Sequence, residues 1–118
     1  MSKYNPLPYQ LDLSKYPNIV SSSVPGPKSS SLHSRASIFY RGISGQVRLF
    51  PVVFESGKGC MLEDVDGNQF IDFSSGIYVT TLGHCHPKVS EAVAKYAHQL
   101  MNAHDFTSEV KVRLLEKM

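Results

Sequence analysis

The fold of this chain is decided by residues 57–87, GKGCMLEDVDGNQFIDFSSGIYVTTLGHCHP. Two short runs, 60–65 and 69–73, hold apolar residues on either side of the turn sequence Asp-Gly-Asn at 66–68. Because Asp-Gly and Gly-Asn supply the left-handed backbone angles of a tight turn, the sequence predicts a β-hairpin here. The segment 77–81 follows, β-branched and aromatic throughout and flanked by glycines. It is the place where a ligand could meet the backbone.

Two helices are predicted after the hairpin. Pro87 suits the first helical position, because the N–H that proline lacks has no helical partner there. Apolar residues then recur at helical spacing over 89–101, and Asn102 can end the helix. Thr107 or Ser108 caps a second helix, whose positively charged first turn contains a glutamate. The apolar faces of both helices need more partners than the hairpin offers, so we expect a chain cut before the rest of its domain.

The chain upstream of the hairpin has a different composition. Residues 1–45 hold five of the seven prolines and two serine triplets without a regular period, so we expect an extended arm. Such an arm could wrap a neighbouring subunit or remain a disordered tail. A short turn or helix is expected over 38–43, and a strand over 46–55 that Pro51 restricts to an edge or a bend. The arm is followed by a small β-hairpin subdomain over 46–82.

Composition excludes several classes of function. At 118 residues the chain is one domain at most, and a net charge of +2 is too weak to indicate nucleic acid or an anionic membrane as partner. Two cysteines do not make a secreted disulfide scaffold. No apolar run reaches the length of a signal peptide core or a membrane span. We therefore expect a cytoplasmic protein.

Metal and acid–base chemistry find little support. Alternate residues of the His-Cys-His sequence at 84–86 rarely converge on one ion, so its histidines are expected to serve a turn and a helix cap. The series Asp64, Asp66 and Asn68 lacks the glycine and glutamate positions of a calcium loop. Asp64 and Asp72 could form an acid–base pair, but carboxylates beside a turn more often bind backbone amides. The sequence therefore predicts no metal ligand and no catalytic residue.

Residue chemistry alone favours a core position over a pocket position for Ile77 and Tyr78, and it stops at an α/β piece of unknown purpose. Several short motifs carry more information, because they follow one another in a fixed order and spacing between residues 51 and 118. They are Gly57-Lys58-Gly59, Leu62 with Asp64, Asp66-Gly67-Asn68, Ile71-Asp72-Phe73, Ser75-Gly76-Ile77, Val79-Thr80, Leu82-Gly83-His84-Cys85-His86-Pro87-Lys88-Val89 and His104-Asp105-Phe106. Through them the chain resembles the N-terminal part of a class III (ω-type) aminotransferase, of the 4-aminobutyrate, acetylornithine and ornithine aminotransferase kind.

The resemblance implies the fold and the reaction. It implies an α/β fold, in which the small N-terminal β-subdomain of a fold-type I pyridoxal-phosphate enzyme leads over 83–118 into the first helices of the large domain. The sheet of that domain would lie beyond the chain. The implied enzyme is a homodimer that moves an amino group from an amine or ω-amino acid, such as 4-aminobutyrate, to a 2-oxo acid. Pyridoxal phosphate stores the amino group and accepts the electrons.

The resemblance also implies a substrate pocket at Gly76, Ile77 and Tyr78. The position matching Ile77 lies beside the substrate in the family, Gly76 keeps the backbone close, and Tyr78 is expected to line the same pocket. No lysine sits in a motif that matches the Schiff-base position; the lysines are Lys3, Lys15, Lys28, Lys58, Lys88, Lys95, Lys111 and Lys117. We therefore expect no cofactor-binding residue and no activity from this chain alone.

Two alternatives stay open at this point. One is a non-enzymatic module that binds a partner through exposed helix faces. The other is part of a class III racemase, aminomutase or decarboxylase, because this segment does not determine the reaction subtype or the amino donor.

Overall fold

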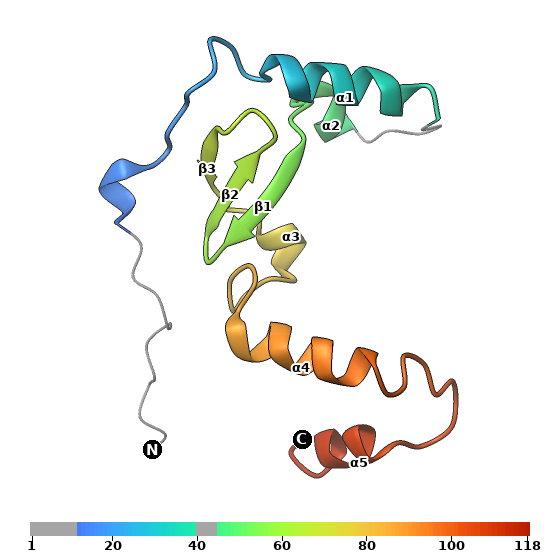
Figure 1. Ribbon diagram of the computed structural model, residues 1–118. Helices are drawn as coiled ribbons and strands as arrows, with labels where there is room; N and C mark the ends of the chain where they lie inside the picture. The colour runs from blue at the N-terminus through green and yellow to red at the C-terminus, as the bar shows by residue number, and fades with distance from the viewer. Residues whose placement is uncertain (1–11, 40–44) are drawn as a thin grey trace. The chain divides into compact units, whose positions relative to one another are not determined.

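The structure is a computed structural model that describes residues 12–39 and 45–118 (Figure 1). It contains two compact units, Met1–His86 and Pro87–Met118, and each is described here by itself. The first part of the predicted arm, 1–11, and most of the predicted turn or helix at 38–43 lie outside the described residues.

The first unit is built on a three-stranded antiparallel sheet in the order β1-β2-β3 (Figure 1). Its strands are β1 (Phe54–Lys58), β2 (Met61–Asp64) and β3 (Gln69–Ile71). Strands β2 and β3 form the predicted hairpin, with Leu62 paired to Phe70. This pairing confirms the hairpin prediction. The sequence could predict it because the Asp-Gly-Asn turn and the apolar runs beside it are local signals that agree with one another.

The hairpin turn is closed by two buried polar side chains. Asp64 is 1% exposed and Asn68 is fully buried. The Asp64 carboxylate accepts hydrogen bonds from the backbone amides of Asp66 (2.9 Å) and Asn68 (2.8 Å) and from the Asn68 side-chain amide (2.8 Å). A buried carboxylate is tolerated only when such donors surround it.

The same asparagine holds the chain upstream of the sheet. Its side-chain oxygen accepts hydrogen bonds from the backbone amides of Val20 and Ser21, both at 2.9 Å. Beside it, Asn18 and Gln69 exchange backbone hydrogen bonds of 3.0 and 2.8 Å in an isolated bridge. The segment before the sheet is therefore fastened to the hairpin over these residues.

The prediction of an extended chain without regular structure is wrong for part of the arm. A short 3-10 helix covers Leu13–Lys15, and α1 covers Pro27–Ser37 (Figure 1). Helix α1 is capped from the hairpin turn, where the two carboxylate oxygens of Asp66 each accept one backbone amide, those of Lys28 and Ser29, at 2.8 Å. Because this cap lies 38 and 37 positions downstream of those amides, the sequence around α1 contains no signal for it.

Gly26 makes the cap possible. A Cβ atom at this position would collide with the side chain of Asp66. The residue preceding α1 therefore has no side chain of its own to cap the helix, and it leaves the space that the distant carboxylate fills.

The predicted strand over 46–55 is also wrong in its first half. Residues Gly45–Leu49 form the short helix α2, and β1 begins only at Phe54. Pro51 has no N–H to donate to a sheet, so pairing can start only after it. The apolar pattern still serves packing, since Phe50 and Phe54 both meet Phe70 edge to face at ring-centroid distances of 5.8 Å.

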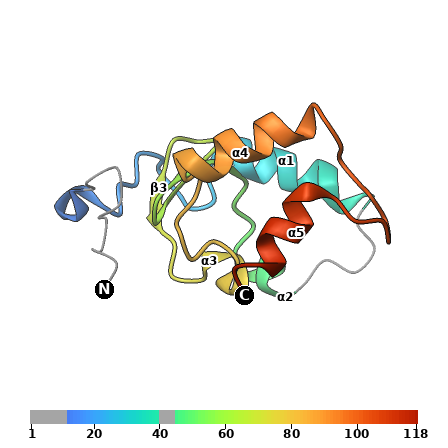
Figure 2. The ribbon, with the colours of Figure 1, turned by 90° about the horizontal axis from the view of Figure 1, so that it is seen from below.

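The second unit contains two helices, α4 (Pro87–Ala97) and α5 (Glu109–Leu115). Figure 2 shows them in orange and red, joined by the loop 98–108. Both predicted starts are confirmed, and Ser108 caps α5 by accepting the Lys111 amide at 3.3 Å. Helix α4 ends at Ala97, earlier than the predicted stop at Asn102. In the described part of the chain, no helix combines the length and the apolar character needed to cross a membrane.

Candidate substrate-binding turn

The residues predicted to line a substrate pocket form a left-handed helical turn, labelled α3 (Ser75–Tyr78). The φ angles of Ser75, Gly76, Ile77 and Tyr78 are 49°, 58°, 63° and 65°. Such angles cost a residue with a side chain about 1–2 kcal/mol, and only glycine adopts them freely. The β-branched and aromatic character of this segment gave no sign of a left-handed turn, whereas the glycine within it permits one.

The backbone of this turn is hydrogen-bonded while its side chains are exposed. The carbonyl oxygen of Ser75 accepts the amides of Val79 (2.8 Å) and Thr80 (3.0 Å). Ile77 is 76% exposed and Tyr78 is 82% exposed. Within this chain neither side chain belongs to a core, so the turn presents an apolar and an aromatic group to its surroundings.

A side-chain hydrogen bond joins the two ends of the segment that carries the turn. Nε2 of His84 lies 2.7 Å from Oδ2 of Asp72, and their side chains are 21% and 5% exposed. His84 also exchanges backbone hydrogen bonds of 2.8 and 3.0 Å with Gly59 at the end of β1. Residues 73–83 are therefore a loop whose base is tied both to itself and to the sheet.

The second oxygen of Asp72 reaches the turn itself. It accepts the amide and the hydroxyl of Ser74, both at 2.8 Å, and the amide of Ser75 at 3.0 Å. Burial by itself raises the pKa of this carboxyl group. The hydrogen bonds from His84, Ser74 and Ser75 outweigh that effect and lower the pKa to about 2. Asp72 is therefore ionised at neutral pH, and it only accepts hydrogen bonds.

Gly57 leaves room for the histidine. It lies in β1. A Cβ atom at Gly57 would stand 3.0 Å from both Cβ and Cγ of His84, which is tighter than ordinary packing allows. The close approach of strand and ring thus depends on the absence of a side chain.

The sequence missed the pairing of Asp72 and His84. His84 was expected to serve a turn or a helix cap, and Asp72 to bind backbone amides. The second expectation is confirmed, and Asp64 likewise binds backbone amides rather than pairing with Asp72. The two partners are 12 positions apart and no periodicity links them, so only the folded loop brings them together. Among the described residues, no three His, Cys, Asp or Glu side chains gather around a metal position.

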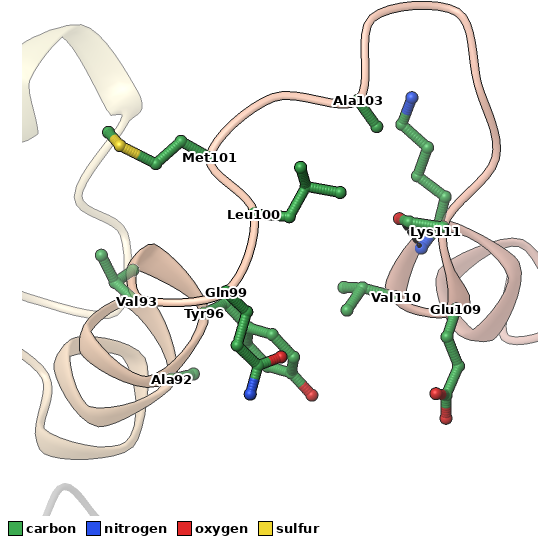
Figure 3. A pocket seen from close by; sticks show the side chains of 11 residues that line it. Ala92, Val93, Tyr96, Gln99, Leu100, Met101, Ala103, Glu109, Val110 and Lys111 are labelled. Carbon is green, nitrogen blue, oxygen red and sulfur yellow. Dashed lines mark hydrogen bonds between the residues drawn. The ribbon is translucent and has the colours of Figure 1, made fainter.

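A separate apolar cavity lies within the second unit. It has a volume of about 520 Å³, and Figure 3 shows Tyr96, Leu100 and Val110 around it. The Lys111 ammonium group closes the neighbouring loop by donating to the carbonyl oxygens of His104 (2.8 Å) and Phe106 (3.0 Å). The cavity is therefore walled by side chains of α4, of α5 and of the loop between them.

The residues of the candidate turn do not fit pyridoxal phosphate. That cofactor needs a lysine for the Schiff base and a carboxylate for its ring nitrogen. Gly76, Ile77 and Tyr78 offer neither. Two lysines of the second unit have partners elsewhere, because Lys111 binds backbone carbonyls and Lys95 lies 5.3 Å from the ring centroid of Tyr96. The turn can form a wall beside a substrate, but it lacks the groups that hold the cofactor.

Comparison with known proteins gives a consistent result. The family model of class III aminotransferases matches residues 43–118. The alanine/serine racemase of Pyrococcus horikoshii is 37% identical over 118 residues, which cover 98% of this chain and 24% of the racemase. The glutamate-1-semialdehyde 2,1-aminomutase of Legionella pneumophila is 41% identical over 92 residues, which cover 73% of this chain and 21% of the aminomutase.

A solved structure agrees with these matches. The acetylornithine aminotransferase of Elizabethkingia anophelis superposes with a TM-score of 0.67 at 26% identity, over 75% of this chain and 22% of that structure. The three-stranded sheet and its helices are thus a small α/β part of a fold-type I pyridoxal-phosphate enzyme, as the resemblance implied. The chain spans about a quarter or less of the length of these relatives.

Proposed function

Because this chain belongs to the class III aminotransferase family, we propose that it forms the N-terminal β-subdomain and first helices of an amino-group-transferring enzyme. The enzyme would move an amino group from an amine or ω-amino acid to a 2-oxo acid. The observation that carries the proposal is the exposed left-handed turn Ser75–Tyr78, which lies within the matched region. We further propose that the complete enzyme is a cytoplasmic homodimer.

The turn would form part of the substrate wall. Ile77 and Tyr78 are both exposed, and together they offer an aliphatic and an aromatic surface to a substrate carbon chain. The backbone at Gly76 is open, since a Cβ atom there would meet nothing within 4 Å. A ligand can therefore approach the main chain at this point.

The 118-residue chain alone would neither hold pyridoxal phosphate covalently nor transaminate. When bound, the cofactor stores the amino group and stabilises a carbanion. This part of the proposal is supported because no lysine of the chain lies in a motif that matches the Schiff-base position, and because Gly76, Ile77 and Tyr78 carry neither an amine nor a carboxylate. The test adds pyridoxal phosphate to the chain, records the absorbance of a protein aldimine and traps it with borohydride. No stoichiometric adduct is expected, and one trapped lysine per chain would contradict the proposal.

A chimera tests the function directly. Residues 43–118 would replace the matching stretch of the Elizabethkingia anophelis acetylornithine aminotransferase, and amino transfer to 2-oxoglutarate would be measured with several amino donors. We expect a cofactor-loaded chimera that transaminates. Within it, Ile77→Ala would raise KM for the donor by about tenfold. A folded, cofactor-loaded chimera that transfers no amino group from any donor would contradict the function.

A second candidate reaction is racemisation or intramolecular amino transfer. It is favoured by two of the similar proteins, the racemase and the aminomutase, which are 37% and 41% identical to this chain. Assaying the same chimera with D-alanine, L-alanine and glutamate 1-semialdehyde separates these reactions.

A non-enzymatic binding module is supported only by the apolar cavity between α4 and α5. A chain that elutes as a single monomeric species in size-exclusion chromatography and unfolds cooperatively on heating would favour that module.

A further inference from the structure

The loop 73–83 leaves the sheet and returns to it, and the candidate turn Ser75–Tyr78 lies near its start. Two links close its base. One is the backbone pair between Gly59 and His84, and the other is the 2.7 Å contact between the side chains of His84 and Asp72. The second link is the more specific, because it requires two particular side chains to meet.

A continuous path of hydrogen bonds runs from His84 to the turn. His84 donates to one oxygen of Asp72, and the other oxygen of Asp72 accepts the amide of Ser75 at 3.0 Å. The carbonyl oxygen of Ser75 then accepts the amides of Val79 and Thr80. The Asp72 side chain is 5% exposed, so this hydrogen bond to a carboxylate is largely shielded from water, and such bonds are stronger there than at the surface.

The turn needs such a link, because its own conformation is unfavourable. Ser75, Ile77 and Tyr78 have positive φ angles, each of which costs about 1–2 kcal/mol for a residue with a side chain. Ile77 and Tyr78 are exposed, so the packing of their side chains contributes little that would offset this cost. Strained backbone of this kind persists only where surrounding contacts impose it.

We propose that Asp72 and His84 are positioning residues that form a clasp, and that this clasp holds the left-handed turn at the substrate wall. The inference rests on the proposed function, which places Ile77 and Tyr78 beside the substrate. The clasp acts through the backbone of Ser74 and Ser75 and does not itself touch the substrate. Gly57 belongs to the same arrangement, because only a glycine lets the ring of His84 lie against β1.

The test measures amide hydrogen exchange in the full 118-residue chain by mass spectrometry with residue-level fragmentation, at a concentration below the micromolar range. The reporters are the amides of Val79 and Thr80, which bind Ser75 within the loop. The references are the amides of Asp64 and Gln69, which bind Asn68 and Asn18 at the hairpin. Exchange at the reporters relative to the references separates loosening of the turn from general loss of stability.

Five variants are compared. Asp72→Ala and His84→Ala should each raise exchange at the reporters by about tenfold and leave the references within about threefold. The double variant should exceed the larger single effect by no more than about threefold, because either change alone opens the clasp. His84→Gln should stay close to the native chain, since its amide nitrogen can donate from near the place of Nε2. His104→Ala is the matched control, because His104 forms an exposed pair with Asp105.

Each outcome decides the inference. Selective loosening of the turn with rescue by His84→Gln supports the clasp. Unchanged reporters in both alanine variants overturn it, and so does equal loosening of reporters and references, because the pair would then be a general stability element. The chimera tests the proposed function by amino transfer, whereas the amide exchange rates of the 118-residue chain require no activity. Failure of the function and failure of the clasp can therefore be distinguished.

Discussion

At the scale of single residues, Asn68 shows how much one buried side chain can hold together in a small unit. Its amide oxygen accepts hydrogen bonds from Val20 and Ser21, and its amide nitrogen donates to the Ser21 hydroxyl and to Asp64, both at 2.8 Å. These bonds join the hairpin turn to a segment 47 and 48 positions upstream. An unsatisfied buried donor or acceptor costs about 1–3 kcal/mol, so this position is sensitive to substitution.

Asn68→Ala should therefore lower the free energy of unfolding of the full chain by roughly 2–4 kcal/mol. The measurement is urea denaturation followed by circular dichroism. Gln69→Ala is the neighbouring control, because the Gln69 side chain is only half-buried and makes one hydrogen bond, to Glu63 at 2.8 Å. It should cost about 1 kcal/mol or less. Equal losses in the two variants would contradict the role of the buried amide.

Asp72 makes stability depend on pH in the acid range. Its pKa is about 2 in the folded chain and 3.8 without the fold, so the folded state prefers the ionised form. The resulting stabilisation is present above about pH 4 and is lost as the pH falls through about 2. After allowance for solvent screening it amounts to roughly 1–2 kcal/mol.

The difference in unfolding free energy between the native chain and Asp72→Asn should consequently shrink as the pH falls from 7 towards 2.5. Urea denaturation at intervals across that range gives the difference directly. Asp105→Asn provides the comparison, since Asp105 lies in an exposed pair. A difference for Asp72→Asn that stays constant down to pH 2.5 would refute the linkage.

At the scale of elements, α1 depends on a cap that another element provides. Burial raises the pKa of the Asp66 carboxyl group. The hydrogen bonds from the amides of Ser29 and Lys28 lower the pKa by more than burial raises it, so the net shift is downward. The carboxylate is thus kept ionised at the N-terminus of the helix, where negative charge is favourable. The hairpin turn and α1 consequently stabilise each other.

Asp66→Ala should release the start of α1. We expect amide exchange at Lys28 and Ser29 to rise by about tenfold and the helical circular dichroism to fall slightly. Asp66→Asn retains one acceptor oxygen, so its effect should lie between those of the alanine variant and the native chain. If both variants leave the two amides protected, the cap does not hold the helix.

The left-handed turn gives a second prediction at this scale. Gly76→Ala should destabilise the chain by about 1 kcal/mol, because alanine is strained at a φ of 58° although the space around it is open. Gly45→Ala at the start of α2 is the matched change, since it too meets nothing within 4 Å and no left-handed angle is involved. It should be neutral or slightly stabilising. Thermal unfolding of the two variants checks the sign of each effect.

At the scale of the whole molecule, the described residues bury very little apolar surface. In the part of the chain that the structure describes, Met61 is the one large apolar residue that is buried. Many others are exposed, among them Phe73, Phe106 and Leu115. Exposed apolar area of this extent is typical of protein–protein contact surfaces and of aggregation-prone surfaces. This agrees with a chain that spans about a quarter or less of the length of its relatives.

The purified chain should therefore bind a hydrophobic dye such as ANS and self-associate at micromolar concentration. Size-exclusion chromatography with light scattering measures the association. Leu115→Ser removes one exposed apolar group from the second unit and should reduce dye binding without loss of helical signal. A monodisperse monomer that binds no dye would contradict this expectation.

The sequence by itself determined the elements whose signals are local. The Asp-Gly-Asn turn placed the hairpin, Pro87 placed the start of α4, and Ser108 placed the start of α5, because in each case the deciding residues lie within a few positions of one another. The order of the motifs over 51–118 determined the family in the same way. What only the tertiary structure decided were the cap on α1, the pairing of Asp72 with His84 and the left-handed turn. The cap and the pairing join residues from separate segments, and the conformational entropy that opposes such contacts is overcome only when the unit folds. The left-handed turn is a conformation that residues with side chains disfavour, so only the contacts of the folded loop impose it.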